Sequence, residues 1–168
     1  MPKSLAGHEL LPPSPLLTLT TVERTEEGWT VLARGPDQAP CPRCGVVSTS
    51  RHSRYVRSVT DLPAVGRSVV LRVQVGRWRC RQPACAVGFF TAGLPGVAEV
   101  RGRRTCRADV VIHLVGHALG GRPGERLIRR LGLPVSDDTL VRQLKRGRVR
   151  RARVRRWSAS MSGRSAVR

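Results

Sequence analysis

The chain has 168 residues, with 31 lysines and arginines against 11 aspartates and glutamates, so its formal net charge at pH 7 is +20. This excess of positive charge indicates a polyanionic partner, with nucleic acid ahead of an anionic membrane surface. Aromatic residues make up only 4% of the chain, which argues against one large core and favours a bound metal as a source of stability. No apolar run approaches the ~20 residues that span a bilayer, and prolines interrupt the N-terminal segment, so we expect neither a membrane anchor nor a secretory signal.

The N-terminal third predicts a β-hairpin. Residues 1–15 are rich in proline, and we expect them to form a flexible N-terminus. Apolar residues and threonines alternate over residues 17–22, which predicts a strand. Glu26-Glu27-Gly28 indicates a turn, and residues 29–33 read as the returning strand.

Two close cysteine pairs follow, each with a proline between its members. They read Cys41-Pro42-Arg43-Cys44 and Cys80-Arg81-Gln82-Pro83-Ala84-Cys85. Each pair predicts a knuckle that supplies two thiolates, and four thiolates complete the shell that structural Zn²⁺ prefers. Gly45 follows the first pair, where a turn residue with positive φ is needed. The long spacer between the pairs must hold a further hairpin or loop. We therefore predict that Cys41, Cys44, Cys80 and Cys85 bind structural Zn²⁺.

Two other uses of the cysteines compete with zinc. A redox CxxC pair opens a helix within a βαβ unit, and no helical pattern follows Cys44. Disulfides seldom persist inside cells, and the odd number of cysteines leaves one of them, here the fifth, Cys106, without a cysteine to pair with. We interpret Cys106 as a spare thiol.

The spacer between the cysteine pairs predicts one turn and one clear strand. Residues 60–63, Thr-Asp-Leu-Pro, look like a turn, and apolar residues alternate over 69–75 in a strand that continues into Cys80. Arginines along this strand could form a basic stripe beside the metal with Trp78 interleaved. Of these we predict Arg72, Arg77 and Arg79 as DNA contacts. A solvated strand face is the alternative.

Helical periodicity replaces strand periodicity after a basic linker at residues 98–107. We predict helices at about residues 108–119, 125–131 and 136–146, with a break at 120–123 and a turn at 132–135. Ser136 suits the N-cap of the third helix, and Asp137 and Asp138 suit its first turn. This order is typical of a helix-turn-helix whose third helix enters the major groove. The predicted DNA contacts on that helix are Thr139, Arg142, Gln143, Lys145 and Arg146. A helical hairpin with a charged outer face is the alternative.

Two histidines have the spacing of a metal pair on a helix. His113 and His117 are four residues apart, but no third ligand is evident. We interpret them as partly buried side chains.

These patterns predict an α+β fold built from a small β-rich zinc-ribbon-like domain and a helix-turn-helix domain. We place the zinc-binding β-rich domain at residues 16–97, the linker at 98–107, the helix-turn-helix at 108–146 and a disordered arginine-rich tail at 147–168.

The order of the parts resembles the ISL-three family of insertion-sequence transposases. The residues that carry the resemblance are Cys41-Pro42-x-Cys44-Gly45, His52-Ser53-Arg54-Tyr55, Asp61-Leu62-Pro63, the strand at 69–79, Cys80-Arg81-x-Pro83-x-Cys85 with Phe90, and the segment 131–140. The resemblance implies a bacterial, nucleoid-associated protein of the cytoplasm that binds the terminal inverted repeats of a mobile element. It implies duplex DNA as the partner, self-association or association with an intact transposase, and no small-molecule substrate.

Full-length members of that family carry a catalytic domain with a carboxylate triad. Cleavage of that kind needs several carboxylates to hold two Mg²⁺ ions, and the last acidic residue here is Asp138. We therefore expect no enzymatic activity from this chain. We hypothesise that a frameshift near Gly147 converted the start of the catalytic domain into the basic tail. Synonymous codons can be chosen for residues 156–168 so that the same DNA, read from two bases later, encodes a different segment. That segment is similar to the one around the first catalytic aspartate of the family.

Three other functions remain open from the sequence. One is a stand-alone transcriptional regulator with the same two modules. The others are a thiol oxidoreductase that uses Cys41 and Cys44, and a basic RNA-binding protein.

Overall fold

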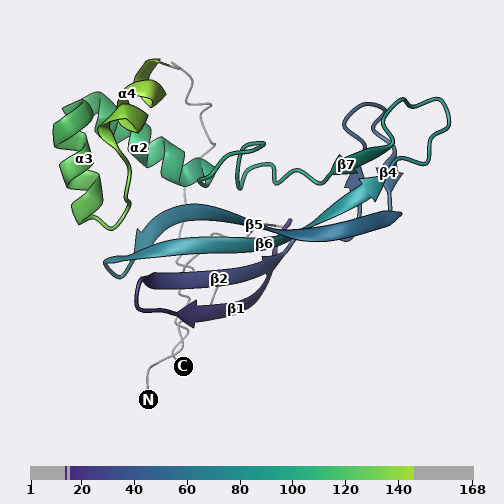
Figure 1. The fold of residues 1–168 in the computed structure, drawn as a ribbon, viewed down its shortest axis with the longest axis horizontal. Coiled ribbons are helices and arrows are strands. Elements are labelled where there is room, and N and C mark those ends of the chain that lie inside the picture. The colour runs from purple at the N-terminus through teal and green to yellow at the C-terminus, as the bar shows by residue number, and fades with distance from the viewer. Residues whose placement is uncertain (1–13, 15, 146–168) are drawn as a thin grey trace, which may run out of the picture.

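The structure is a computed structural model that describes residue 14 and residues 16–145, so the predicted arginine-rich tail and all of the predicted N-terminus except residue 14 lie outside the described residues (Figure 1). A β-rich region comes first and three helices follow, as the α+β prediction requires. The strands are β1 (Thr18–Arg24), β2 (Gly28–Arg34), β3 (Ala39–Pro40), β4 (Val47–Ser48), β5 (Arg51–Ala64), β6 (Arg67–Arg79) and β7 (Phe89–Thr91). The helices are α2 (Cys106–Leu119), α3 (Gly121–Arg130) and α4 (Asp137–Lys145).

The main sheet has five strands in the order β1-β2-β6-β5, and β7 pairs with the end of β6. The predicted hairpin is present as β1 and β2, which are antiparallel. The spacer between the cysteine pairs forms a second, longer hairpin from β5 and β6. Its return strand lies parallel to β2, so the sheet is mixed.

The turn predicted at residues 60–63 is wrong, because all four residues belong to β5. The chain reverses instead at Val65 and Gly66, which have φ angles of 51° and 68°. Pro63 is tolerated in the strand because the register with β6 is irregular between Asp61 and Ala64, so no ladder bond requires its missing N–H.

One face of the sheet forms the larger core. Its central side chains come from alternate positions of three strands: Val31, Val59, Val69, Leu71, Val73 and Val75, all buried. Leu94 and Ala98, from the segment after β7, belong to the same cluster and cover this face. The core therefore lies between the sheet and an irregular segment.

The predicted linker at residues 98–107 packs along the edge of β5. The Thr60 N–H donates to the Arg103 carbonyl at 2.9 Å, and the Thr105 N–H donates to the Thr60 carbonyl at 2.9 Å. The Arg57 guanidinium donates to the Gly102 carbonyl at 2.8 Å. These bonds attach the start of the helical region to the sheet.

The three helices share a second core made of Ile112, Ile128, Leu133, Val135 and Leu140. Helix α2 begins at Cys106, two residues before the predicted start, because Thr105 acts as its N-cap and accepts a hydrogen bond from the Ala108 N–H.

Helix α3 begins at Gly121, four residues before the predicted start, and only Gly120, with φ 73°, separates it from α2. Pro123 lies in its first turn, where no N–H is needed. Within the described part of the chain, no helix combines the length and apolar character that a membrane span requires.

Candidate metal centre

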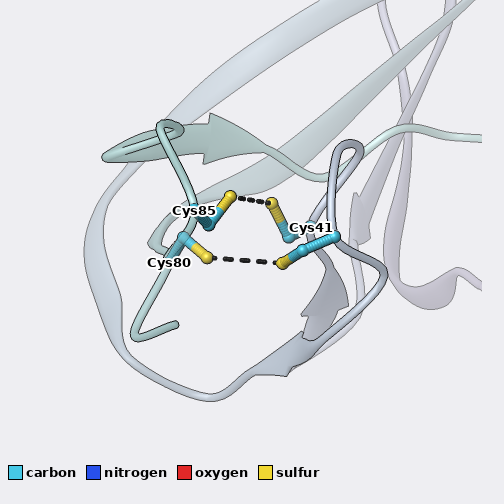
Figure 2. A group of neighbouring side chains, drawn as sticks. Cys41, Cys80 and Cys85 are labelled. Carbon is cyan, nitrogen blue, oxygen red and sulfur yellow. Dashed lines mark hydrogen bonds between the residues drawn. The ribbon is translucent and has the colours of Figure 1, made fainter. Parts of the chain in front are cut away.

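The four predicted cysteine ligands lie together at the end of the sheet where β7 pairs with β6. Their sulfur atoms are all within 4.8 Å of one another. Cys41 Sγ is 3.9 Å from Cys85 Sγ, and Cys44 Sγ is 3.6 Å from Cys80 Sγ. Figure 2 shows Cys41 directed from one knuckle toward Cys80 and Cys85 of the other.

These spacings fit one tetrahedral zinc ion. Zn–S bonds of ~2.3 Å in a tetrahedron place neighbouring sulfurs about 3.8 Å apart, and the Cys41–Cys85 and Cys44–Cys80 separations of 3.9 and 3.6 Å lie on either side of that value. A disulfide would need about 2.05 Å between sulfurs, and all five cysteines are free. The donor set and its geometry therefore match a structural zinc site, with no position open for a substrate.

The first knuckle is built by local backbone hydrogen bonds. The Gly45 N–H donates to the Cys41 carbonyl at 2.9 Å, and the Cys41 N–H donates to the Val46 carbonyl at 2.9 Å. Gly45 has φ 73°, so the positive φ predicted there is confirmed. Strands β3 and β4 pair on either side of the turn and hold Cys41 and Cys44 at its tip.

The second knuckle closes the gap between β6 and β7. The Cys80 N–H donates to the Gly88 carbonyl at 3.0 Å, and the Cys85 N–H donates to the Gln82 carbonyl at 3.0 Å. Strand β5 begins soon after Cys44, and β6 leads into Cys80. The long β5–β6 hairpin is therefore the further hairpin or loop that we predicted from the length of the spacer between the cysteine pairs.

The thiols differ in acidity before a metal binds. The backbone N–H of Cys44 is the main cause that lowers the pKa of Cys41, to about 7. The pKa of Cys80 is raised to about 12, because burial and the neighbouring thiols of Cys44, Cys85 and Cys41 outweigh the stabilising backbone N–H of Gln82. The Cys41 thiolate is therefore favoured by its backbone N–H bonds, whereas a thiolate at Cys80 needs a cation beside it.

A buried tryptophan supports the metal centre from β6. Trp78 is fully buried, so its predicted place in an exposed basic stripe is wrong. Its ring lies against Gly76, where an added Cβ would come within 2.8 Å of the indole, and the Arg51 guanidinium lies 4.8 Å from its centroid. Trp78 and Phe90 are opposite each other in the β6–β7 pair, which joins the knuckle to the core. Sequence reasoning missed this role, although a glycine two residues before a tryptophan on a strand is a signal for such packing.

The three predicted DNA-contact arginines of β6 are exposed but do not form one stripe. Arg77 and Arg79 are opposite Thr91 and Phe89 of β7, beside the knuckles. Arg72 lies between the buried Leu71 and Val73 and therefore faces away from the core. Because side chains alternate along a strand, Arg72 is on the opposite side of β6 from the other two arginines.

The aromatic neighbour of these arginines is partly exposed. The Arg79 guanidinium lies 5.6 Å from the ring centroid of Phe89, and the His52 ring is 4.6 Å from the same ring in an edge-on arrangement. Basic and aromatic side chains thus adjoin the metal centre on one surface.

The predicted DNA contacts on helix α4 differ in whether their side chains already bond to other groups of the protein. Arg142 and Lys145 are exposed, and no ion pair in the described part of the chain engages them. The Gln143 amide donates to Asp109 Oδ1 of α2 at 3.2 Å, and Thr139 Oγ1 lies 3.0 Å from Ser136 Oγ. Arg146 lies outside the described residues.

The histidine pair gains no third ligand. The rings of His113 and His117 are 6.3 Å apart. Across residue 14 and residues 16–145, the four cysteines are the only group of three or more side chains positioned to hold a metal. The remaining cysteine, Cys106, is half-buried, and burial together with the charges of Glu99 and Asp109 raises the pKa of its thiol.

Comparison with known families bears directly on this centre. Residues 37–85 match the family model described as the zinc-finger of transposase IS204/IS1001/IS1096/IS1165. The match contains both cysteine pairs and the β5–β6 hairpin, ends before the helices, and covers well under half of the chain. No curated protein and no solved structure matches the chain. The zinc cofactor predicted from the sequence is confirmed, and the β-rich region contains a transposase-type zinc finger.

Proposed function

We propose that this chain is the DNA-binding part of an insertion-sequence transposase and that it recognises the terminal inverted repeats of its element. The observation that carries the proposal is the four-sulfur centre inside a segment that matches a transposase zinc finger. The net charge of +20 supports a polyanionic partner. Self-association on the paired ends, or association with an intact transposase, is part of the same proposal.

The helices supply the sequence-reading element of this proposal. Helices α3 and α4 are joined by a turn in which Gly132 has φ 85°, and both pack on α2 around the core at Ile128 and Leu140. This arrangement supports a helix-turn-helix in which α4 enters the major groove. Arg142 and Lys145 are its available basic side chains, while Gln143 would have to leave Asp109 to reach a base edge.

The zinc finger supplies phosphate contacts near the metal. Arg77 and Arg79 are exposed at the β7 end of the sheet, beside the knuckles that zinc holds in place. Phosphate contacts of this kind position a protein on the duplex without reading its sequence. Loss of the zinc would displace these arginines together with the knuckles.

We assign binding rather than strand cleavage to this part of the chain. Transposases of the carboxylate-triad class hold two metal ions with several acidic side chains. The residues that the structure describes contain no such acidic group, since the four cysteines are their only candidate metal cluster.

The proposal is tested by fluorescence anisotropy with the zinc-loaded chain. Duplexes are made from the DNA that flanks the gene at each element end, from its upstream region, and from a scrambled sequence of equal composition. We expect the element ends to bind at least tenfold more tightly than the scrambled duplex, since each well-placed base contact contributes about 1–3 kcal/mol. Cys106→Ser should retain this preference and Cys44→Ser should lose it.

Other outcomes separate the competing functions. Preference for the upstream region would instead identify a transcriptional regulator, and preference for RNA hairpins an RNA-binding protein. Equal affinity for every duplex would overturn recognition of the ends. Thiol–disulfide exchange by the zinc-loaded protein would point to an oxidoreductase.

A further inference from the structure

On the sheet face opposite the core, the stretch around Arg34 and Arg72 is exposed among the described residues and carries basic side chains. Leu32 of β2 and Ser58 of β5 are both opposite Arg72 in the register, so these residues share one face. Arg34 is opposite Gln74, two residues further along on the same face. Arg34 and Arg72 are exposed, whereas Ala33, Leu71 and Val73 beside them are buried on the other face.

The two arginines border one surface hollow. Thr20, Leu32, Val56 and Gln74 line it together with Arg34 and Arg72. Neighbouring strands lie about 4.8 Å apart and successive residues rise about 3.3 Å, so the Cα atoms of Arg34 and Arg72 are about 8 Å apart. Two guanidinium groups at that separation can reach one phosphate or two successive phosphates. Arg54 precedes Val56 by two residues in β5, so both side chains lie on the same face of the sheet. Arg54 is therefore a third exposed arginine at the edge of this face.

These arginines have no partner in the described part of the chain. Their backbones pair within the sheet, but no hydrogen bond, ion pair or ring contact within residue 14 and residues 16–145 engages the guanidinium group of Arg34, Arg54 or Arg72. Glu23 is the acidic residue that the strand alternation places on this face, and it is opposite Thr30, four residues along β2 from Arg34. The face therefore carries unneutralised positive charge.

We propose that this sheet face, defined by Arg34, Arg72 and Arg54, is a second DNA-contacting surface that binds backbone phosphates without reading sequence. The inference rests on the proposed DNA-binding function and adds a surface separate from the knuckle arginines and from α4. The face holds three exposed arginines, and an extended polyanion is the partner that complements their charge. The chain itself offers little to neutralise it, because residues 146–168 contain no acidic residue and residues 1–13 contain only Glu9.

The test compares two double variants with equal loss of charge. In one, Arg34→Gln and Arg72→Gln remove the proposed contacts. In the other, Arg101→Gln and Arg103→Gln remove exposed arginines from the segment that packs along the edge of β5. Each protein is titrated with an element-end duplex and with the scrambled duplex at salt concentrations between 50 and 200 mM, and zinc content and thermal midpoint are measured to verify folding.

The proposal predicts a change in the salt dependence of binding. Each phosphate contact contributes about −0.9 to the slope of log K against log salt, so the Arg34/Arg72 variant should show a slope about 1.8 shallower. Raising salt from 50 to 200 mM should then cost this variant about 12-fold less affinity than it costs the unaltered chain. Both duplexes should show the same change, and the ratio of their affinities should stay constant, because phosphate contacts carry no sequence information.

Several results would overturn the proposal. One is an unchanged slope in a folded, zinc-loaded Arg34/Arg72 variant. Another is an equal change in the Arg101/Arg103 variant, which would show that net charge alone matters. A loss of affinity confined to the element-end duplex would assign this face a role in reading sequence. Failure of the proposed function itself is recognised separately, because the unaltered chain would then show no preference for element ends.

Discussion

Asp61 Oδ1 accepts a 2.6 Å hydrogen bond from the hydroxyl of Thr105, and both residues are buried. Asp61 belongs to β5, whereas Thr105 is the N-cap of α2. The same carboxylate accepts hydrogen bonds from the Leu62 N–H at 2.8 Å and from Arg107 Nε at 2.7 Å. One buried acidic side chain thus joins the sheet that carries the zinc finger to the first turn of the helical region.

Replacement of Asp61 by alanine should weaken this junction. Removing one partner of a buried ion pair costs about 3–5 kcal/mol, and we expect about 2 kcal/mol here because the Arg107 side chain is 33% exposed. Urea unfolding should report the lower stability, and hydrogen exchange should show lost protection in the first turn of α2. Thr105→Ser keeps the hydroxyl and should stay within about 0.5 kcal/mol of the original protein. Unchanged stability of Asp61→Ala would show that the junction is held by other contacts.

Removal of one zinc ligand should unfold the knuckles. Cys44→Ser replaces an exposed thiolate, and three remaining thiolates cannot complete the tetrahedral shell. We expect metal analysis to find about one zinc per chain in the original protein and in Cys106→Ser, and far less in Cys44→Ser. Near-ultraviolet circular dichroism should follow Trp78, which lies next to the centre. Full zinc occupancy in Cys44→Ser would refute the four-sulfur site.

Substitution of Gly76 should disturb the packing of Trp78. An added Cβ would lie 2.8 Å from two indole carbons, so the buried ring would have to move. Overpacking of this kind costs about 1–3 kcal/mol, and Gly76→Ala should lower the free energy of unfolding by that amount. Gly88→Ala is the matched control, since an added Cβ there meets nothing within 4 Å. If both variants unfold at the same urea concentration, the contact between Gly76 and Trp78 does not limit stability.

Acidification should release the zinc ion. Zinc binding displaces protons from thiols, so its apparent affinity falls as pH falls. Cys80, whose pKa is about 12, loses a proton on binding at every pH between 6 and 9. Cys41, whose pKa is about 7, loses one only below that value. The number of protons released per zinc should therefore rise by about one as the pH falls through 7, and competition with a chromophoric chelator at several pH values would measure it. A constant proton count across this range would show that Cys41 is not the acidic thiol of the cluster.

The sequence by itself determined the metal centre and three of the strands, β1, β2 and β6. Two cysteines separated by a proline-containing turn form a knuckle through short-range backbone bonds, so their spacing predicts the ligands without knowledge of the rest of the fold. Alternation over residues 69–75 predicted β6 for the same reason, because a strand period is visible in neighbouring residues. The positive φ at Gly45 followed from its place in that turn.

The tertiary structure decided which of these local elements meet, and on which side. Thr60–Pro63 reads as a turn in isolation, but Asp61 finds its partners 44 and 46 residues away and stays in a strand. Trp78 is buried because Gly76 and Arg51 make room for it and cover it. Alternation along β6 puts Arg72 on the opposite face from Arg77 and Arg79, but Arg72 lies beside Arg34 only because β2 pairs with β6 in parallel. Strand register is set by contacts between distant segments, and one residue of register decides which face a side chain occupies, so no local pattern could have grouped these arginines.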